Sequence, residues 1–182
     1  MVFILAITSL CLDLSDQSEM KKKIAVLPGS FDPITIGHVD IVRRALPLFD
    51  EIVIAIGVNS QKKYLFPLEQ RKAWLRSIFE FEPKVKVDDY QGLTLKYCQK
   101  IDSDYLIRGI RNAADFDYER TISQINHTVE KQLDTVFFIA RPELSHISST
   151  IVRELILGAG DISAFVPQLI LDDISGMAIT EH

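Results

Sequence analysis

Four segments of this sequence combine small residues, hydroxyl groups, histidine and cations, and each segment follows an apolar run. They are residues 28–38 (PGSFDPITIGH), 59–63 (NSQKK), 108–112 (RGIRN) and 145–153 (SHISSTIVR). Proteins commonly hold phosphates with hydroxyls, guanidinium groups and the backbone N–H groups at helix starts. The four segments therefore predict a site for a phosphorylated ligand.

The first segment places Gly37 and His38 at the expected start of a helix. The free N–H groups and the positive end of the helix dipole favour an anion there, and Gly29 allows a ligand to approach the backbone closely. The segment matches neither the P-loop pattern nor GxGxxG. His38 alone could equally be a helix-start residue bonded to a nearby carbonyl, but the cations of the other segments favour a phosphate contact.

The cations also have two interpretations. Lys62 and Lys63 alone would be solvated surface charges. Arg108 immediately follows an apolar strand, and an arginine at a buried strand end normally has an anionic partner. Phosphate suits the planar guanidinium group, but a salt bridge within the protein is the alternative for Arg108 and Arg111. The candidate partners for such a bridge are Asp115, Asp117 and Glu119.

The last segment contains three consecutive hydroxyl residues, Ser148, Ser149 and Thr150, before another expected helix. These residues can cap the helix start and can also bind phosphate, and the two roles are compatible. His127 and His146 show no spacing typical of metal ligands. The residues therefore predict no dedicated metal site.

Apolar periodicity predicts strands and helices that alternate between these segments. Residues 51–58 form a nearly continuous apolar strand, typical of burial on both faces, and residues 135–140 are interpreted as the last buried strand. A helix over 116–133 carries one apolar stripe, and a helix over 67–81 places Trp74 and Phe81 on one face. The other strands are expected at 22–27, 85–88 and 104–108, and the other helices at 37–49, 93–101, 148–157 and 166–173.

This alternation predicts an α/β fold. We expect a Rossmann-like, doubly wound sheet of five parallel strands, with helices on both faces and further helices at the C-terminal end. In such sheets the ligand lies beyond the carboxyl ends of the strands. The four segments lie at those ends, so the fold should bring them together.

Composition limits the classes of protein that fit. The chain has 182 residues, 47% hydrophobic and 25% charged, which suits one globular domain and excludes global disorder. A net charge of −5 argues against a broad basic face that binds nucleic acid. Two cysteines are too few for a disulfide framework, and they are compatible with the cytoplasm.

The N-terminus differs from the rest of the chain. Residues 2–12 are apolar but shorter than a membrane span, and no positive charge precedes them as in a signal peptide. We expect translation to start at Met20, which makes residues 1–19 an extension and 20–182 a single domain. A targeting segment and an additional apolar arm are the alternatives. No other long apolar run is present, so an integral membrane protein is not expected.

Four motifs carry a resemblance to a known family: GSFDPxTxGH, the KK pair, IRGIRNAADFDYE and ISSTIVR. Over about residues 22–171 the chain resembles the bacterial phosphopantetheine adenylyltransferases, members of the nucleotidyltransferase superfamily marked by HxGH. Thr35 replaces the first histidine of HxGH, which points to this family within the superfamily. The segment from Ile107 to Glu119 is more specific still. Ile36 and the N-terminal extension depart from the family pattern.

The resemblance implies a reaction and its partners. AMP would pass from ATP to 4′-phosphopantetheine, giving dephospho-coenzyme A and pyrophosphate in coenzyme A biosynthesis. The acceptor phosphate would attack directly and in line, without a covalent intermediate. Mg²⁺ would accompany ATP, held by phosphates and water, and the protein would be a cytoplasmic homo-oligomer, a hexamer in the family. A related nucleotidyltransferase with another acceptor, or a nucleotide-binding module without catalysis, stays open.

The resemblance also implies site residues. The catalytic residues would be His38, Ser30, Lys62 and Arg111. The phosphopantetheine site would comprise Ser30, Lys62, Thr94 and Arg108. The ATP site would comprise Ser30, Phe31, His38, Gly109, Ile110, Arg111, Glu119, Leu144, Ser145, His146, Ile147, Ser148, Ser149 and Thr150.

Overall fold

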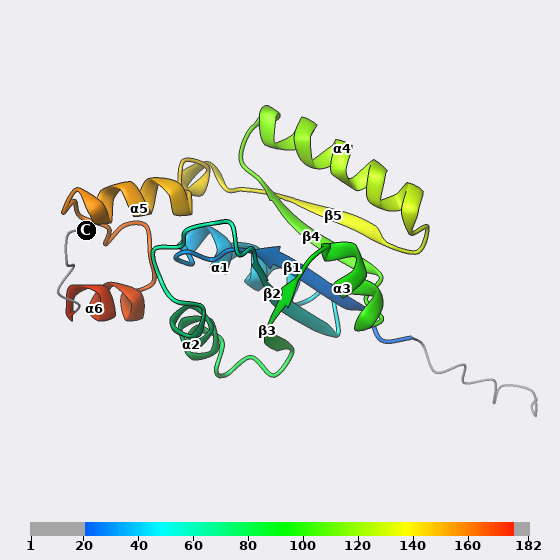
Figure 1. The fold of residues 1–182 in the computed structure, drawn as a ribbon, viewed down its shortest axis with the longest axis horizontal. Coiled ribbons are helices and arrows are strands. Elements are labelled where there is room, and N and C mark those ends of the chain that lie inside the picture. Colours follow the sequence, from blue (N-terminus) through cyan, green and yellow to red (C-terminus); the bar gives the residue numbers. More distant parts are fainter. Residues whose placement is uncertain (1–20, 177–182) are drawn as a thin grey trace, which may run out of the picture.

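The structure, a computed structural model, describes residues 21–176 and contains one sheet of five parallel strands (Figure 1). The strands are β1 (Ile24–Gly29), β2 (Glu51–Val58), β3 (Val85–Gln91), β4 (Tyr105–Ile110) and β5 (Asp134–Ile139). Their order in the sheet is β3-β2-β1-β4-β5. This arrangement confirms the predicted doubly wound α/β fold. The predicted N-terminal extension, residues 1–19, lies outside the described residues.

Helices cover both faces of the sheet, as predicted. They are α1 (Ile36–Ala45), α2 (Leu68–Ile78), α3 (Thr94–Lys100), α4 (Ala113–Val129), α5 (Ser149–Leu157) and α6 (Gln168–Gly176), with a short 3₁₀ turn, η1 (Pro142–Leu144). Helices α1, α2, α5 and α6 contribute to the larger apolar core, whereas α3 contributes to a smaller core on the opposite face. Within residues 21–176 no helix has both the length and the apolar character needed to cross a membrane.

Strand β2 shows why the sheet has two cores. Ile52, Ile54 and Ile56 belong to the larger core, and the alternating residues Val53 and Ala55 belong to the smaller one. Successive side chains of a strand point to opposite faces, so a strand covered on both sides needs apolar residues at every position. The predicted bounds and burial of residues 51–58 are therefore confirmed.

The junction between β1 and β4 is the point where the strand order reverses. β1 pairs with β2 from Ile24 to Gly29, but β1 pairs with β4 only at Ala25–Tyr105 and Val26–Leu106. Beyond these pairs the strands are not paired, and the Arg108 side chain bridges them by donating from Nη1 to the Pro28 carbonyl at 3.4 Å. The sheet thus opens where doubly wound folds bind their ligands.

The strand predicted over residues 135–140 is confirmed as β5, but its predicted burial is wrong. β5 lies at the edge of the sheet, and Phe138 is its one buried residue, whereas Ile139 is 62% exposed. An apolar run predicts that a strand forms, but whether the strand lies at the centre or the edge of the sheet depends on pairing between segments far apart in the sequence. The edge position explains the difference.

Two helix predictions also needed correction. The expected helix over 67–81 ends at Ile78, and Phe81 is 89% exposed instead of sharing the buried face of Trp74. The expected helix over 116–133 begins at Ala113, because Asn112 caps it by accepting from the Asp115 backbone N–H at 2.9 Å. None of the 17 residues of α4, all of them described, is buried in the single chain. Its predicted apolar stripe is Tyr118, Ile122, Ile125, Val129 and Leu133, of which Leu133 lies beyond the helix.

Candidate active site

A cavity of about 500 Å³ lies where β1 and β4 separate. Its wall comes from β1, β4, the start of α1, the start of α4 and the segment before α5. Three of the four predicted segments therefore meet at one place. The predicted residues that line this cavity are His38, Arg108, Gly109, Arg111, Glu119, Leu144, Ile147, Ser148, Ser149 and Thr150.

His38 lies in the first turn of α1 with its ring held by Thr35. Nδ1 of His38 is 3.1 Å from the backbone N of Thr35 and 2.8 Å from Thr35 Oγ1. Since a backbone N–H can only donate, Nδ1 must accept, and a neutral ring then carries its proton on Nε2. Burial, and to a smaller extent the positive charge of Arg111, lowers the pKa of His38 to about 4. At neutral pH His38 is therefore an uncharged donor beside the cavity.

The ring of Phe31 packs against the ring of His38. The two rings meet edge to face, with centroids 5.2 Å apart, and Phe31 is buried with a φ of 46°. A Cβ on Gly29 would come within 2.9 Å of the Phe31 ring. The space beside Gly29 is thus filled by Phe31, not left open for a ligand as the sequence suggested.

The two arginines of the β4–α4 segment each pair with a carboxylate. Arg108 is bidentate on Glu119, with its Nε 2.7 Å from Oε2 and its Nη2 against Oε1. Arg111 donates from Nε to Asp115 at 2.9 Å. These are the salt bridges that the sequence left open as an alternative. The arginines still line the cavity, so a phosphate placed there would compete with the carboxylates.

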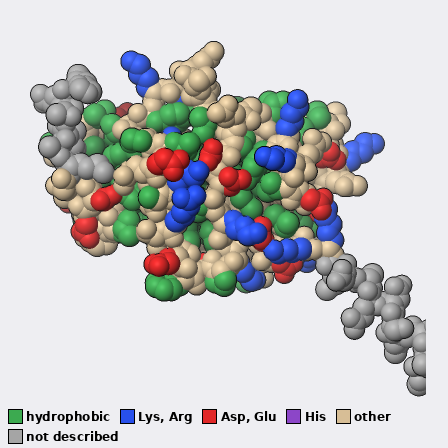
Figure 2. Space-filling view, turned by 60° about the horizontal axis from the view of Figure 1, so that its bottom comes forward, with side chains coloured by type: hydrophobic (Ala, Val, Ile, Leu, Met, Phe, Trp, Pro, Cys, Tyr) green, Lys and Arg blue, Asp and Glu red, His purple; other side chains and the backbone are tan. Residues whose placement is uncertain are grey.

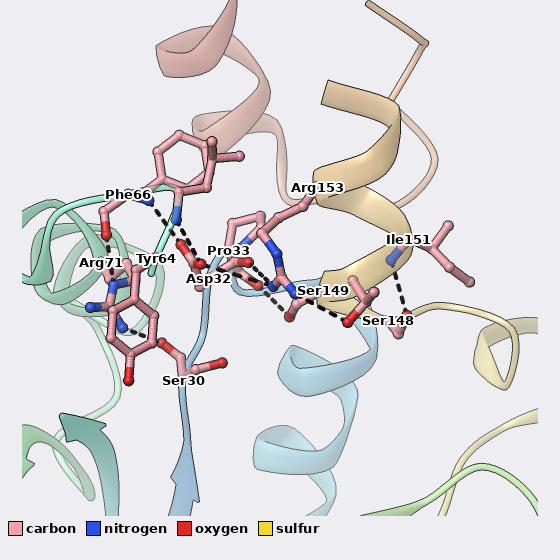
Figure 3. Close-up of polar contacts among 12 residues, drawn as sticks. Ser30, Asp32, Pro33, Tyr64, Phe66, Arg71, Ser148, Ser149, Ile151 and Arg153 are labelled. Carbon is pink, nitrogen blue, oxygen red and sulfur yellow. Dashed lines mark hydrogen bonds and ion pairs between the residues drawn. The ribbon is translucent and has the colours of Figure 1, made fainter. Parts of the chain in front are cut away.

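The start of α5 forms the opposite wall. Ser148 caps the helix by accepting from the Ile151 backbone N–H at 3.2 Å, which confirms the predicted N-cap. Ser149 Oγ donates to the carbonyl of Pro33 at 2.8 Å. Arg153 donates to the Asp32 carbonyl at 2.7 Å and to Thr150 Oγ1 at 3.1 Å. Figure 3 shows how these contacts fasten the start of α5 to the β1–α1 loop.

A second cavity, of about 390 Å³, lies between α3, α4 and the sheet. Thr94 lines this cavity together with apolar residues such as Leu93 and Ile122. Arg108 and Glu119 line both cavities. The two cavities therefore meet at this ion pair, a charged point between a polar chamber and a largely apolar groove.

Several predicted site residues do not line either cavity. Ser30 is half-buried beside the first cavity, and Lys62 is exposed on the loop after β2. Ile110 is buried in the sheet, Ser145 Oγ donates to the Pro142 carbonyl, and His146 packs against Phe165. Their proposed roles in binding stay predictions.

Sequence reasoning missed the residues that hold the loops in place. Asp32 and Arg71 are both only 2% exposed. Asp32, on the β1–α1 loop, bonds to the β2–α2 loop, and Arg71, on α2, bonds to the β1–α1 loop. Asp32 stood inside a quoted motif, whereas Arg71 was not singled out. Arg71 lies three residues before Trp74, on the same helix face, and both are buried. That spacing could have identified a buried arginine, but its partners on two loops could not be found from it.

The cavity is lined by hydrogen-bond donors such as His38, Arg108 and Arg111, and the thiol of Cys98 lies outside it. Burial raises the pKa of the Cys98 thiol to about 12, and Cys98 belongs to the small apolar core on the α3 face. On the face of the molecule drawn in Figure 2, Lys and Arg side chains are interspersed with Asp and Glu. The cavity brings together Arg108, Arg111 and the hydroxyl residues at the start of α5.

Comparisons with known proteins agree with this geometry. The profile of the cytidylyltransferase-like family matches residues 26–155. The chain is 49% identical over 146 residues to a phosphopantetheine adenylyltransferase of Flavobacterium psychrophilum, covering 80% of this chain and 96% of that protein. It is 45% identical over 152 residues to the protein of the same name from Lachnoclostridium phytofermentans, covering 84% and 93%.

A solved structure shares the fold. It comes from Vibrio parahaemolyticus, carries the provisional name nicotinate-nucleotide adenylyltransferase, and superposes with a TM-score of 0.64. The match covers 85% of this chain and 99% of that chain, at 16% sequence identity. At that identity the likeness concerns the arrangement of the sheet and helices.

Proposed function

Because this chain belongs to the phosphopantetheine adenylyltransferase family, we propose that it transfers AMP from ATP to 4′-phosphopantetheine. The products are dephospho-coenzyme A and pyrophosphate, in coenzyme A biosynthesis. One observation supports this assignment above the others: Arg108 stands where a polar cavity and an apolar groove meet. A phosphate that carries a long, weakly polar arm fits that junction.

The reaction needs positioning more than it needs acid–base chemistry. A phosphate monoester already carries nucleophilic oxygen atoms near neutral pH. One such oxygen attacks the α-phosphorus of ATP, a new P–O–P bond forms, and the bond to the β-phosphate breaks in line with it. Pyrophosphate leaves with the electron pair, so no covalent enzyme intermediate is required.

His38 supplies a donor for the α-phosphate. Its Nδ1 is engaged by Thr35, which leaves the Nε2 proton for the cavity. As charge redistributes over the α-phosphoryl oxygens, a fixed donor at the start of α1 stabilises the transition state. Because Nδ1 accepts from the Thr35 backbone N–H, the ring carries its proton on Nε2 over the whole physiological pH range.

The other residues divide between the two substrates. Lys62 and Arg108 hold the acceptor phosphate, Ser30 contacts both that phosphate and ATP, and the pantetheine arm lies along Thr94 in the apolar groove. Arg111 and the start of α5 hold the phosphates of ATP, with Gly109 and Glu119 in the nucleotide site. On binding, the acceptor phosphate takes the place of the Glu119 carboxylate beside Arg108.

Mg²⁺ enters with ATP in this proposal. Among residues 21–176 no group of three or more His, Cys, Asp and Glu side chains is arranged to hold a metal ion. The described side chains therefore fit an ion that takes its ligands from phosphate oxygens and water. Mg²⁺ reduces the negative charge that the attacking phosphate meets.

The functional unit in this proposal is a homo-oligomer, with a hexamer as the expected form. Helix α4 and the edge strand β5 expose apolar side chains, including Phe116, Val129 and Ile139. Exposed apolar patches on a protein surface often mark interfaces between chains. Light scattering coupled to gel filtration tests this part of the proposal, and a monomer at micromolar concentration contradicts it.

Turnover tests the function directly. The full chain is incubated with ATP, Mg²⁺ and a panel of acceptors, and pyrophosphate release is followed. Release with 4′-phosphopantetheine, and much less with nicotinate mononucleotide or glycerol 3-phosphate, is the expected result. Preference for another acceptor identifies a related nucleotidyltransferase, and no release with any acceptor contradicts an enzymatic role.

A further inference from the structure

The guanidinium group of Arg71, on α2, is buried and bonds to two loops at once. Its Nη1 donates to the carbonyl of Ser30, on the β1–α1 loop, at 2.7 Å. Its Nε donates to the carbonyl of Phe66, on the β2–α2 loop, at 3.0 Å. One side chain therefore spans the two loops that carry Ser30 and Lys62.

Arg71 also reaches the base of the loop that carries Lys62. Its guanidinium lies over the ring of Tyr64 at 4.3 Å, a cation–π contact. The hydroxyl of Tyr64 accepts from the Asn59 backbone N–H at 3.1 Å and donates to the Gly57 carbonyl at 3.3 Å. Tyr64 thus closes this loop, and Arg71 packs on the residue that closes it (Figure 3).

Asp32 joins the same two loops, but it lies on the β1–α1 loop and bonds to the β2–α2 loop. Its carboxylate accepts from the backbone N–H groups of Leu65 and Phe66, both at 2.9 Å. Asp32 and Arg71 are both buried. The two loops are therefore joined by bonds that run each way, and their spacing is fixed from both sides.

Burying a cation costs folding free energy, so a residue that only filled this space would be better apolar. Burial lowers the pKa of Arg71, and the nearby charge of Asp32 opposes that effect in part. Apolar residues of similar volume often replace buried charges without loss of stability. Arg71 lines neither cavity, so it acts on the site through the groups that it holds.

We propose that Arg71 is a positioning residue for the acceptor phosphate, which sets the distance between Ser30 and the loop of Lys62. This inference rests on the proposed function, which assigns Ser30 and Lys62 to that phosphate. The other side of the β1–α1 loop is fastened to α5 by Arg153, beside the nucleotide site. Arg71 therefore governs the acceptor more than it governs ATP.

The first measurement is a split between the two substrates. Arg71→Lys keeps the positive charge but cannot serve both carbonyls and the Tyr64 ring together. We expect the Kd and KM for 4′-phosphopantetheine to rise about tenfold to a hundredfold, while the Kd for ATP changes less than about threefold. Arg76→Lys is the matched control, since Arg76 is an exposed arginine on the same helix, and it should change neither constant.

A double-mutant cycle tests whether Arg71 acts through Lys62. If it does, Arg71→Lys costs much less acceptor affinity in a Lys62→Ala background than in the wild type. A purely structural role predicts the same cost in both backgrounds. Equal costs, or equal losses for ATP and acceptor, overturn the proposal.

Two further measurements keep the outcome clear. If Arg71→Lys does not fold, Tyr64→Phe retains the ring but opens the loop, and it should weaken acceptor binding several-fold without affecting ATP. An unchanged acceptor affinity in that variant overturns the proposal. Turnover of the wild type is measured in parallel, and its absence rejects the proposed function. Normal wild-type turnover, together with variants that weaken ATP and acceptor binding equally, rejects the role of Arg71 alone.

Discussion

The two sides of the cavity are held by different kinds of contact. On the β1–α1 side, the loop is buried and bonded mostly through backbone groups, as between Arg153 and the Asp32 carbonyl or Thr35 and His38. On the β4–α4 side, partly exposed arginines pair with carboxylates, Arg108 with Glu119 and Arg111 with Asp115.

This difference indicates how each side meets its substrate. The donors on the β1–α1 side are already in place, so they lose little freedom when a transition state forms. The arginines on the β4–α4 side must exchange a carboxylate for a phosphate, and their contribution is a difference between two charged contacts. Loss of the His38 donor on the first side should therefore lower the rate most, and loss of an arginine on the second side should mainly lower substrate affinity.

The largest effect is expected for His38→Ala. Loss of one fixed donor should lower kcat by about 10²–10³-fold, roughly 3–4 kcal/mol, while the affinity for ATP changes much less. Steady-state kinetics and circular dichroism on the same preparation measure this. His127→Ala, at an exposed position outside both cavities, is the control. A near-normal kcat in His38→Ala would make His38 a structural helix-start residue.

Arg108→Ala tests the other side. A charge-assisted contact is worth about 1.5–3 kcal/mol, so acceptor affinity should fall about tenfold to a hundredfold, and ATP affinity should fall less. The unpaired Glu119 carboxylate would then repel the incoming phosphate. Calorimetry with each substrate measures the split, and Arg108→Lys, which retains charge without the bidentate fork, should fall between. Equal losses for both substrates would be inconsistent with the assignment.

Gly29→Ala tests how rigid the β1–α1 side is. The new methyl group would lie 2.9 Å from the buried ring of Phe31, which has little room to move beside His38. We expect a loss of about 1–3 kcal/mol in the free energy of unfolding, measured with urea. Gly176→Ala, whose methyl would have no neighbour within 4 Å, is the control. An unchanged stability for Gly29→Ala would show that the loop adapts easily.

The smallest effect concerns pH. The pKa of His38 is about 4 in the folded protein, below its value near 6.5 in the unfolded chain. As pH falls, the unfolded chain therefore binds this proton before the folded protein does. The contribution of neutral His38 to the free energy of unfolding is complete above about pH 6.5 and is lost as pH falls toward 4. At pH 6 the loss should be below about 1 kcal/mol. The difference in unfolding free energy between wild type and His38→Gln, followed from pH 8 to 5, isolates this contribution; a difference independent of pH contradicts it.

Local signals in the sequence predicted much of the fold. Residues 51–58 were predicted to the residue because an uninterrupted apolar run has one simple interpretation. The hydroxyl residues from Ser148 onward predicted the start of α5 correctly as well. The helix start at Ala113 could have been found from Asn112 and Asp115, but the apolar stripe shifted the prediction towards residue 116.

Features that depend on the meeting of distant segments were beyond such signals. The edge position of β5 and the exposure of α4 follow from strand order. The filling of the space beside Gly29 follows from the ring orientation of Phe31. The gathering of the predicted segments was predictable, because the carboxyl ends of parallel strands share one edge of the sheet. Glu119 was one of three candidate partners for Arg108, whereas the partners of Arg71 were not predicted.

In the proposed oligomer, the absence of buried residues from α4, a helix described in full, would tie the acceptor side of the site to mass action. A helix without buried residues gains little from packing within one chain, and most helical stability comes from packing. A second copy of the chain that covered α4 would add its binding free energy to the ordered form of the helix. Since α4 carries Glu119 and walls the apolar groove, acceptor affinity in that oligomer should rise with protein concentration until α4 is covered.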